Sequence, residues 1–245
     1  MSAEKFDRVE DDYLARFVEP NRVFYDEVKK RLSERVGKSL SEIILDIGAG
    51  PGVVARLLDE ADLMGHVVGW EPSNLHKQGV ELQQKLDKER RGVVYTPFQG
   101  DFRAALSNMI DMGWQYDAIT FVRSAHEIAE SSSRDSFFRQ LQLASGFVKP
   151  GGMILVADPM YTLEASSNPE IIRSVREIQQ RTLGHSHIPG DYINPFSILH
   201  ILRNQGFRRY TTKVLPHPAL QSVAEAYSLK QTPIVFHVTD YVRTH

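Results

Sequence analysis

Short runs of apolar residues alternate with amphipathic stretches along most of the chain from residue 43 onward. The apolar runs have the length and β-branched content of buried strands, and they cover Ile43–Ile47, His66–Glu71, Val93–Phe98, Tyr116–Val122 and Met153–Asp158. Stretches with helical spacing lie between them, at Val53–Ala61, Leu75–Lys88, Phe102–Met112 and Asp135–Phe147. This alternation predicts an α/β fold with a parallel sheet, helices on both faces and a ligand site at the carboxyl ends of the strands.

An amphipathic helix is predicted before the first strand. Its apolar stripe follows Pro20 and Asn21, and Asn21 suits the N-cap position. The stripe consists of Val23, Phe24, Val28, Leu32 and Val36. We therefore expect residues 1–40 to form an N-terminal helical cover over the sheet.

The alternation breaks after Asp158. A helix carrying Ile171, Ile172, Val175 and Ile178 is predicted there, so residues 159–193 are interpreted as a lid or substrate-binding insertion. A further helix is expected to begin at Asn194-Pro195. Two final strands, Phe207–Leu215 and Pro233–Tyr241, are expected to pair with each other. One domain spanning residues 1–245 is the simplest organisation.

Composition and charge exclude several classes of protein. A net charge of −2 in 245 residues gives no general attraction for nucleic acid or for an anionic membrane. The absence of cysteine excludes a disulfide framework, thiolate metal ligands and a cysteine nucleophile. Residues 1–12 are acidic and polar, unlike a signal peptide. We expect a cytoplasmic protein with no membrane partner and no nucleic-acid partner, for which a homodimer is possible.

A glycine-rich turn joins the first strand to the next helix. Gly48, Gly50 and Gly52 allow a ligand to approach the backbone, and the helix presents unpaired N–H groups to it. Glu71 ends the second strand, where a carboxylate can accept hydrogen bonds from ribose hydroxyls. A dinucleotide fingerprint would need glycine at Val53, which makes an NAD(P)-dependent oxidoreductase the weaker alternative. A purely structural turn is the other alternative.

The segment from Asp46 to Gly52 matches an acidic residue followed by G-x-G-x-G, and it resembles the first motif of class I methyltransferases. The resemblance continues through Glu71, Gln99–Phe102, Tyr116–Ile119 and Lys149–Met153. It implies a Rossmann-like sheet of seven strands, mostly parallel with an antiparallel last strand, and S-adenosyl-L-methionine as cofactor. In that family pattern Asp46 supports the methionine end, Glu71 holds the ribose, and Asp101 with Phe102 meets adenine. The implied cofactor-binding residues are Asp46, Gly48, Ala49, Gly50, Glu71, Pro72, Asp101, Phe102, Arg123 and Ser124.

His126 and Glu127 follow the fourth strand, where the family places groups near the methyl. They are the candidate catalytic residues, with His126 as the candidate base. The alternative is that His126 only caps the following helix.

Residues of the insertion and of the N-terminal cover are the candidates for substrate contact. They are Tyr25, Tyr161, His185, His187 and Tyr192, with Arg22, Met160 and Phe196 as further possibilities. The aromatic residues could equally belong to the core, and the two histidines to plain loop structure. No third ligand accompanies His185 and His187, so no metal is expected.

The sequence thus predicts methyl transfer to oxygen, nitrogen or carbon of a small-molecule acceptor. The alternatives are a cofactor-binding regulatory or scaffold protein, a non-methylating enzyme, or the oxidoreductase.

Overall fold

The computed structural model describes residues 13–183, 187 and 192–244. Within these residues the strands form one seven-stranded sheet in the order β3-β2-β1-β4-β5-β7-β6. The strands are β1 (Lys38–Ile47), β2 (Met64–Glu71), β3 (Val93–Gln99), β4 (Tyr116–Val122), β5 (Val148–Tyr161), β6 (Phe207–Pro216) and β7 (Ile234–Arg243). Strands β1 to β5 pair in parallel, whereas β7 runs antiparallel to both of its neighbours. The predicted Rossmann-like sheet, including the pairing of the last two strands, is confirmed.

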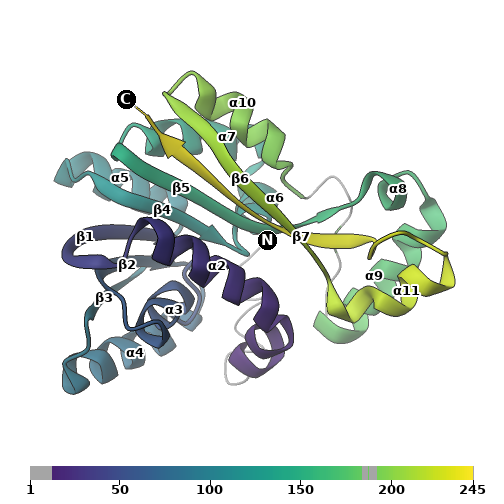
Figure 1. The fold of residues 1–245 in the computed structure, drawn as a ribbon, viewed down its shortest axis with the longest axis horizontal. Helices are drawn as coiled ribbons and strands as arrows, with labels where there is room; N and C mark the ends of the chain where they lie inside the picture. The colour runs from purple at the N-terminus through teal and green to yellow at the C-terminus, as the bar shows by residue number, and fades with distance from the viewer. Residues whose placement is uncertain (1–12, 184–186, 188–191, 245) are drawn as a thin grey trace.

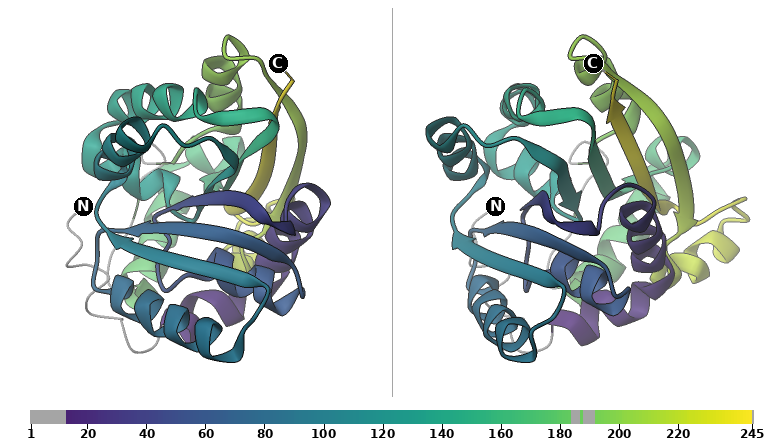
Figure 2. Two further views of the ribbon diagram at one scale, coloured as in Figure 1. Left: turned by 90° about the vertical axis from the view of Figure 1, so that its left-hand side faces the viewer. Right: turned by 60° about the vertical axis from the view of Figure 1, so that its left-hand side comes forward.

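Helices cover both faces of this sheet (Figures 1 and 2). One core cluster joins the sheet to α5 (Phe102–Met112), α6 (Ala125–Ser132), α7 (Arg134–Ser145) and α10 (Pro195–Arg203). The cluster on the other face involves α2 (Arg22–Arg35), α3 (Val53–Glu60) and α4 (Leu75–Glu89). The helix α6 is short and was not predicted.

The N-terminal cover differs in detail from the expected stripe. A π-helical turn, η2 (Leu14–Val18), and a 3₁₀ turn, η3 (Glu19–Asn21), precede α2. Asn21 occupies the N-cap position, but its side chain accepts no capping bond from the described helix. The buried face consists of Phe24, Tyr25, Val28 and Leu32, while Val23 is 69% exposed. Phe24, Val28 and Leu32 are spaced by four residues and form the buried face of α2, so Val23 points to the outside.

A small lobe extends from one edge of the sheet, at the right of Figure 1. It contains α8 (Leu163–Ser166), α9 (Pro169–Leu183), the turn η5 (Pro218–Leu220) and α11 (Gln221–Ala226). The ends of β5 and β7 reach into it as a two-stranded ribbon, in which Asp158 is opposite His237 and Tyr161 is opposite Ile234. The lobe has its own core, to which both the 159–193 segment and the β6–β7 connection contribute.

None of the helices in the described part of the chain is long and apolar enough to cross a membrane.

Candidate functional site

A pocket of about 590 Å³ lies at the carboxyl ends of the parallel strands. Its walls come from the segments that follow β1, β2, β3 and β4, and the strand order reverses between β1 and β4. Eight of the residues predicted to bind the cofactor line this pocket: Gly48, Gly50, Glu71, Pro72, Asp101, Phe102, Arg123 and Ser124. The structure therefore gathers at one topological switch point residues that the sequence separates by more than seventy positions.

The glycine turn after β1 is held close to the segment after β4. Gly48 has φ +70°, and a Cβ added there would lie 2.4 Å from the Cβ of Ser124. The Ser124 hydroxyl in turn donates a 2.6 Å hydrogen bond to the carbonyl of Ile47. Glycine is required at position 48 because both its backbone conformation and its neighbour exclude a side chain.

Glu71 organises the same turn from the end of β2. Its Oε2 atom accepts a 2.8 Å hydrogen bond from the Gly50 amide, and its Oε1 atom accepts two from Ser73, from the amide at 2.9 Å and the hydroxyl at 2.5 Å. Burial raises the pKa of Glu71, although these donors oppose the shift. Each carboxylate oxygen can accept a further hydrogen bond, so Glu71 can fix the turn and also receive a ligand hydroxyl.

Asp46 and Ala49 lie beneath the turn and do not line the pocket. The Asp46 carboxylate accepts a 2.7 Å hydrogen bond from the Thr120 hydroxyl on β4. Burial raises the pKa of Asp46 to about 7, and the bond from Thr120 opposes that shift. Ala49 is buried, and its Cβ lies 3.0 Å from the position that a Cβ on Gly69 would take. These two residues support the turn from below.

Asp101 caps the helix that follows β3. Its side chain accepts a 2.9 Å hydrogen bond from the Ala104 amide at the start of α5. Asp101 is exposed beside the pocket, whereas the neighbouring Phe102 is buried against Phe121 and Phe137. The cap fixes the direction of the carboxylate and leaves its second oxygen for a ligand.

His126 lies in the first turn of α6 and is bound to Asp158 on β5. Its Nδ1 atom lies 2.8 Å from Oδ1 of Asp158, and its amide donates a 2.9 Å hydrogen bond to Oδ2. Burial lowers the pKa of His126, but Asp158, with a further contribution from Glu127, overcomes this effect and raises the pKa to about 10. His126 is thus held in place and charged at neutral pH.

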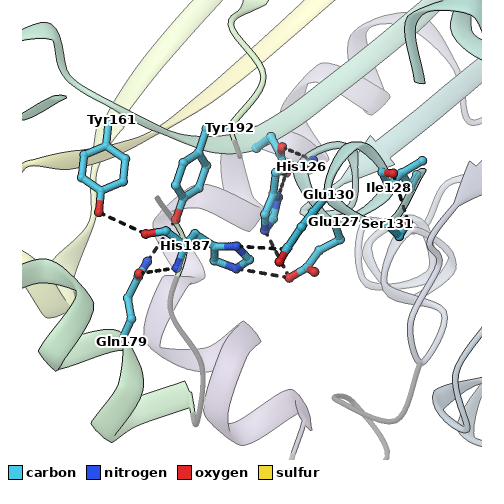
Figure 3. Close-up of polar contacts among 10 residues, drawn as sticks. His126, Glu127, Ile128, Glu130, Ser131, Tyr161, Gln179, His187 and Tyr192 are labelled. Atoms are coloured by element: carbon cyan, nitrogen blue, oxygen red, sulfur yellow. Dashed lines mark hydrogen bonds and ion pairs between the residues drawn. The ribbon is translucent and has the colours of Figure 1, made fainter. Parts of the chain in front are cut away.

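Glu127 lies between two imidazole rings (Figure 3). Its Oε1 atom is 3.4 Å from Nε2 of His126 and 3.5 Å from Nε2 of His187. On the other side of its ring, His187 has Nδ1 3.3 Å from Oε2 of Glu130. Glu127 also lines the pocket, so it connects the histidines to the space where a ligand would bind.

The lobe fixes His187 through Gln179 of α9. The Gln179 amide group donates a 3.0 Å hydrogen bond to the Tyr192 hydroxyl and accepts one of 3.0 Å from the His187 amide (Figure 3). The Tyr192 ring stacks on His126 with centroids 5.5 Å apart, and Tyr161 meets Tyr192 edge-on. Tyr161 and Tyr192 are therefore core residues of the lobe as well as neighbours of His126. His185 lies outside the described residues.

The comparisons with known proteins agree with this arrangement. A family model described as a methyltransferase domain matches residues 16–212, which is most of the chain. The chain belongs to this methyltransferase family. The predicted resemblance to class I methyltransferases, with S-adenosylmethionine as their cofactor, is confirmed at the level of the family. No curated protein matches the chain by sequence.

Solved structures of several other proteins share the fold at low identity. One is a SAM-dependent methyltransferase from Thiobacillus denitrificans in complex with S-adenosyl-L-homocysteine, with 14% identity, a TM-score of 0.57 and 96% of each chain covered. The YjhP protein of E. coli has 16% identity and a TM-score of 0.58, with 98% of each chain covered. The [4+2]-cyclase SpnF has 13% identity and a TM-score of 0.57, covering 89% of this chain and 80% of its own.

In this methyltransferase none of the described candidates for substrate contact is among the residues that line the pocket. Tyr161, His187 and Tyr192 lie in the lobe beside His126, and three others lie farther away. Tyr25 is 1% exposed in the core under α2, and its hydroxyl accepts a hydrogen bond from Arg123. Arg22 forms an exposed ion pair with Glu60 at 2.6 Å. Phe196 is 61% exposed on α10. Tyr25 is kept from the pocket by its burial at the α2 interface, and Arg22 and Phe196 by the outward direction of their helix faces. Residue type alone does not predict these positions.

Several residues of the pocket wall and one positioning residue were not among the predicted site residues. The wall residues are Tyr13, Ile47, Leu75, Gly100, Arg103, Ile128, Ser131, Ser132 and Gln140. Tyr13 lines the pocket, and its ring lies 3.9 Å from the position that a Cβ on Gly50 would take. Asp158 binds His126 although 32 positions separate the two residues. Asp158 could have been found, because it ends a predicted strand of a parallel sheet whose strands all end at the ligand-binding edge, whereas no periodic pattern surrounds Tyr13.

Proposed function

We propose that this methyltransferase binds S-adenosylmethionine in the pocket beside Gly50 and Glu71 and transfers its methyl group to a small-molecule acceptor. The observation that carries the proposal is the pairing of the Glu71 carboxylate with the Gly50 amide at 2.8 Å inside the pocket wall. This pairing holds the glycine-rich turn next to a fixed carboxylate. Such a surface suits the ribose and amino-acid portions of a sulfonium nucleoside.

The lining residues suggest a direction for the bound cofactor. Asp101 and Phe102 at the end of β3 would meet adenine, and Glu71 would accept the ribose hydroxyls. Gly48 and Ser124 would then lie along the methionine portion. The transferable methyl would face the segment after β4, which includes Glu127. Methyl transfer is an in-line displacement, so the main task of these residues is to align donor and acceptor.

Glu127 is the better candidate for contact with the acceptor than His126. His126 is 4% exposed and is charged at neutral pH because Asp158 raises its pKa to about 10, so its ring cannot accept a proton. Glu127 lines the pocket and brings a carboxylate to it. A carboxylate there can accept the proton that an oxygen or nitrogen nucleophile loses. His126 and Asp158 would position Glu127 rather than react themselves.

Three alternatives belong to different classes of protein. A fold shared with the [4+2]-cyclase SpnF is compatible with a reaction other than methylation, and a regulatory cofactor-binding protein needs no acceptor at all. The oxidoreductase alternative is weakened by Val53, which stands where a dinucleotide site would need its third glycine.

Calorimetric titration of the full chain tests the cofactor. S-adenosylmethionine and S-adenosylhomocysteine are the ligands, and NAD(H) and NADP(H) are the controls. Micromolar binding of the sulfur nucleosides alone is expected, and a screen of acceptors with a methyl-labelled donor would follow. Dinucleotide binding would instead establish the oxidoreductase. Cofactor binding without transfer to any acceptor would favour the regulatory protein or the non-methylating enzyme.

A further inference from the structure

The imidazoles of His126 and His187 and the carboxylate of Glu127 converge beside the pocket. Ion pairing alone would not require both rings to face the same carboxylate oxygen. One ligand atom from each of His126, Glu127 and His187 can be chosen so that all three lie within 4.8 Å of one another. The Nε2 atoms of both histidines approach the same Glu127 oxygen, at 3.4 and 3.5 Å. Ligands bound to zinc at 2.0–2.1 Å in tetrahedral geometry are separated by about 3.3 Å. The two measured separations are close to that value.

A second carboxylate also lies on the Nδ1 side of each imidazole, in a hydrogen bond for His126 and in an ion-pair contact for His187. Nδ1 of His126 lies 2.8 Å from Asp158, and Nδ1 of His187 lies 3.3 Å from Glu130. Carboxylates in this position fix the ring of a metal-bound histidine and increase its basicity. Both Nε2 atoms are thereby turned toward Glu127, as two ligands of one ion would be.

The charges in the cluster favour a cation. Asp158, Glu127 and Glu130 bring three carboxylates to two imidazoles, and both histidines are less than 5% exposed. The carboxylates therefore outnumber the imidazoles in this cluster. A divalent ion reduces the excess negative charge without placing two protons on adjacent buried rings.

We propose that His126, Glu127 and His187 form a binding site for one divalent transition-metal ion of the zinc type. Two imidazoles with one carboxylate are a ligand set that zinc and iron(II) accept, and magnesium prefers more oxygen ligands. The site joins α6 to the segment that follows α9, so the ion would tie the lobe to the sheet. This proposal replaces the expectation of no metal. That expectation looked for a third ligand beside His185 and His187, whereas Glu127 comes from a different part of the chain.

Three protein ligands leave a coordination position for an oxygen of the acceptor. A bound ion lowers the pKa of a coordinated hydroxyl, and Glu127 would then serve as a ligand rather than as a proton acceptor. This role rests on the proposed methyl transfer, whereas ion binding itself does not.

The test is metal titration of the full chain after chelator treatment and removal of the chelator. Calorimetry with Zn²⁺ should give one ion per chain, and Co²⁺ should give the visible absorption bands of a low-coordinate site. Because the chain contains no cysteine, thiolate binding cannot mimic this result. If neither Zn²⁺ nor Co²⁺ binds with one ion per chain, the proposal is wrong and these residues form only a cluster of ion pairs.

Variants locate the ion. His187→Gln and His126→Gln should each abolish stoichiometric Zn²⁺ binding, and Asp158→Asn should weaken it by about 10- to 100-fold. His200→Gln, on the exposed face of α10, is the matched control and should leave binding unchanged. Binding that persists in His187→Gln would refute this ligand set. S-adenosylhomocysteine affinity, measured in the same variant, confirms that the chain is folded and tests the cofactor site separately.

Discussion

The Nδ1 atom of His126 lies 2.8 Å from the Oδ1 atom of Asp158, and both side chains are buried. This contact joins the start of α6 to the end of β5 and keeps the imidazole charged in the metal-free protein. Asp158→Asn removes the charge that compensates this ring. We expect a loss of about 2–4 kcal/mol in the free energy of unfolding.

Chemical denaturation of the metal-free chain measures this loss. Asp111→Asn, on the exposed end of α5, is the control and should change stability by less than about 0.5 kcal/mol. Equal stability of the Asp158→Asn variant and the original protein would show that the His126 contact contributes little.

Glu71→Gln should weaken cofactor binding. Glutamine keeps the shape of the side chain, but its NH₂ group cannot accept the hydrogen bonds from Gly50 or Ser73 that Glu71 accepts. The loss of a charged acceptor for the ribose should raise the dissociation constant of S-adenosylmethionine by about 10- to 100-fold. Calorimetry measures it, with the exposed Glu89→Gln as control. Unchanged affinity would remove Glu71 from the cofactor site.

Gly48→Ala should be more damaging than a typical glycine substitution. The new Cβ would overlap Ser124 at 2.4 Å in addition to the strain of φ +70°. Gly113→Ala is a matched control because it has φ +62° and no atom within 4 Å of its Cβ. We expect about 1 kcal/mol of destabilisation for Gly113→Ala, and at least twice that with loss of cofactor binding for Gly48→Ala. Similar effects in both variants would mean that Ser124 moves aside.

Gln179→Met should loosen the lobe. The change preserves side-chain length but removes the bonds to the Tyr192 hydroxyl and the His187 amide, both 3.0 Å long. Hydrogen exchange should become faster in α9 and α11, with about 1–3 kcal/mol lost locally. The neighbouring Gln180 is exposed, so Gln180→Met is the control. If exchange in α9 is unaffected, Gln179 does not hold the lobe together.

His217 should make stability depend on pH in the acidic range. Burial, with a contribution from Arg123, lowers its pKa in the folded protein to about 4, while the unfolded chain has the ordinary value near 6.5. The unfolded state therefore binds more protons between these values, and stability falls as pH decreases from about 6.5 to 4.

His217→Phe retains the aromatic contact with Phe236 and should remove up to about 3 kcal/mol of this dependence. Denaturation at a series of pH values measures the slope, with His200→Gln as control. A slope that is the same in His217→Phe would assign the pH dependence to other groups.

Regular elements of this fold could be predicted because they are long or strongly patterned. The first and last residues of β4 and α5 are those predicted. The pocket lies at the carboxyl ends of the parallel strands, as expected from the predicted sheet. The helices α6 and α11 have eight and six residues, which is too short for a period of 3.6 to become visible. The β6–β7 connection therefore gave no sign that it would complete the core of the lobe.

The site was predictable where local backbone geometry decides it. Gly48 and Glu71 belong to a strand–turn–helix unit, so their positions follow from the sequence around them. The position of His187 depends instead on how α9 docks and on the bonds made by Gln179, which no local pattern encodes. The Glu127–His187 contact, on which the proposed metal site depends, therefore required the three-dimensional structure.

The ribbon formed by the ends of β5 and β7 gives the molecule two parts. Residues that line the pocket lie at the carboxyl ends of the strands and in the adjoining turns and helices, whereas the lobe beyond Asp158 and His237 is joined to them by two paired strands and by the contacts of Tyr192 and His187 with α6. A different lobe could be grafted onto this ribbon while the pocket stays intact. The lobe could then be exchanged as a module, by transferring residues 159–193 and 218–232 together between related methyltransferases.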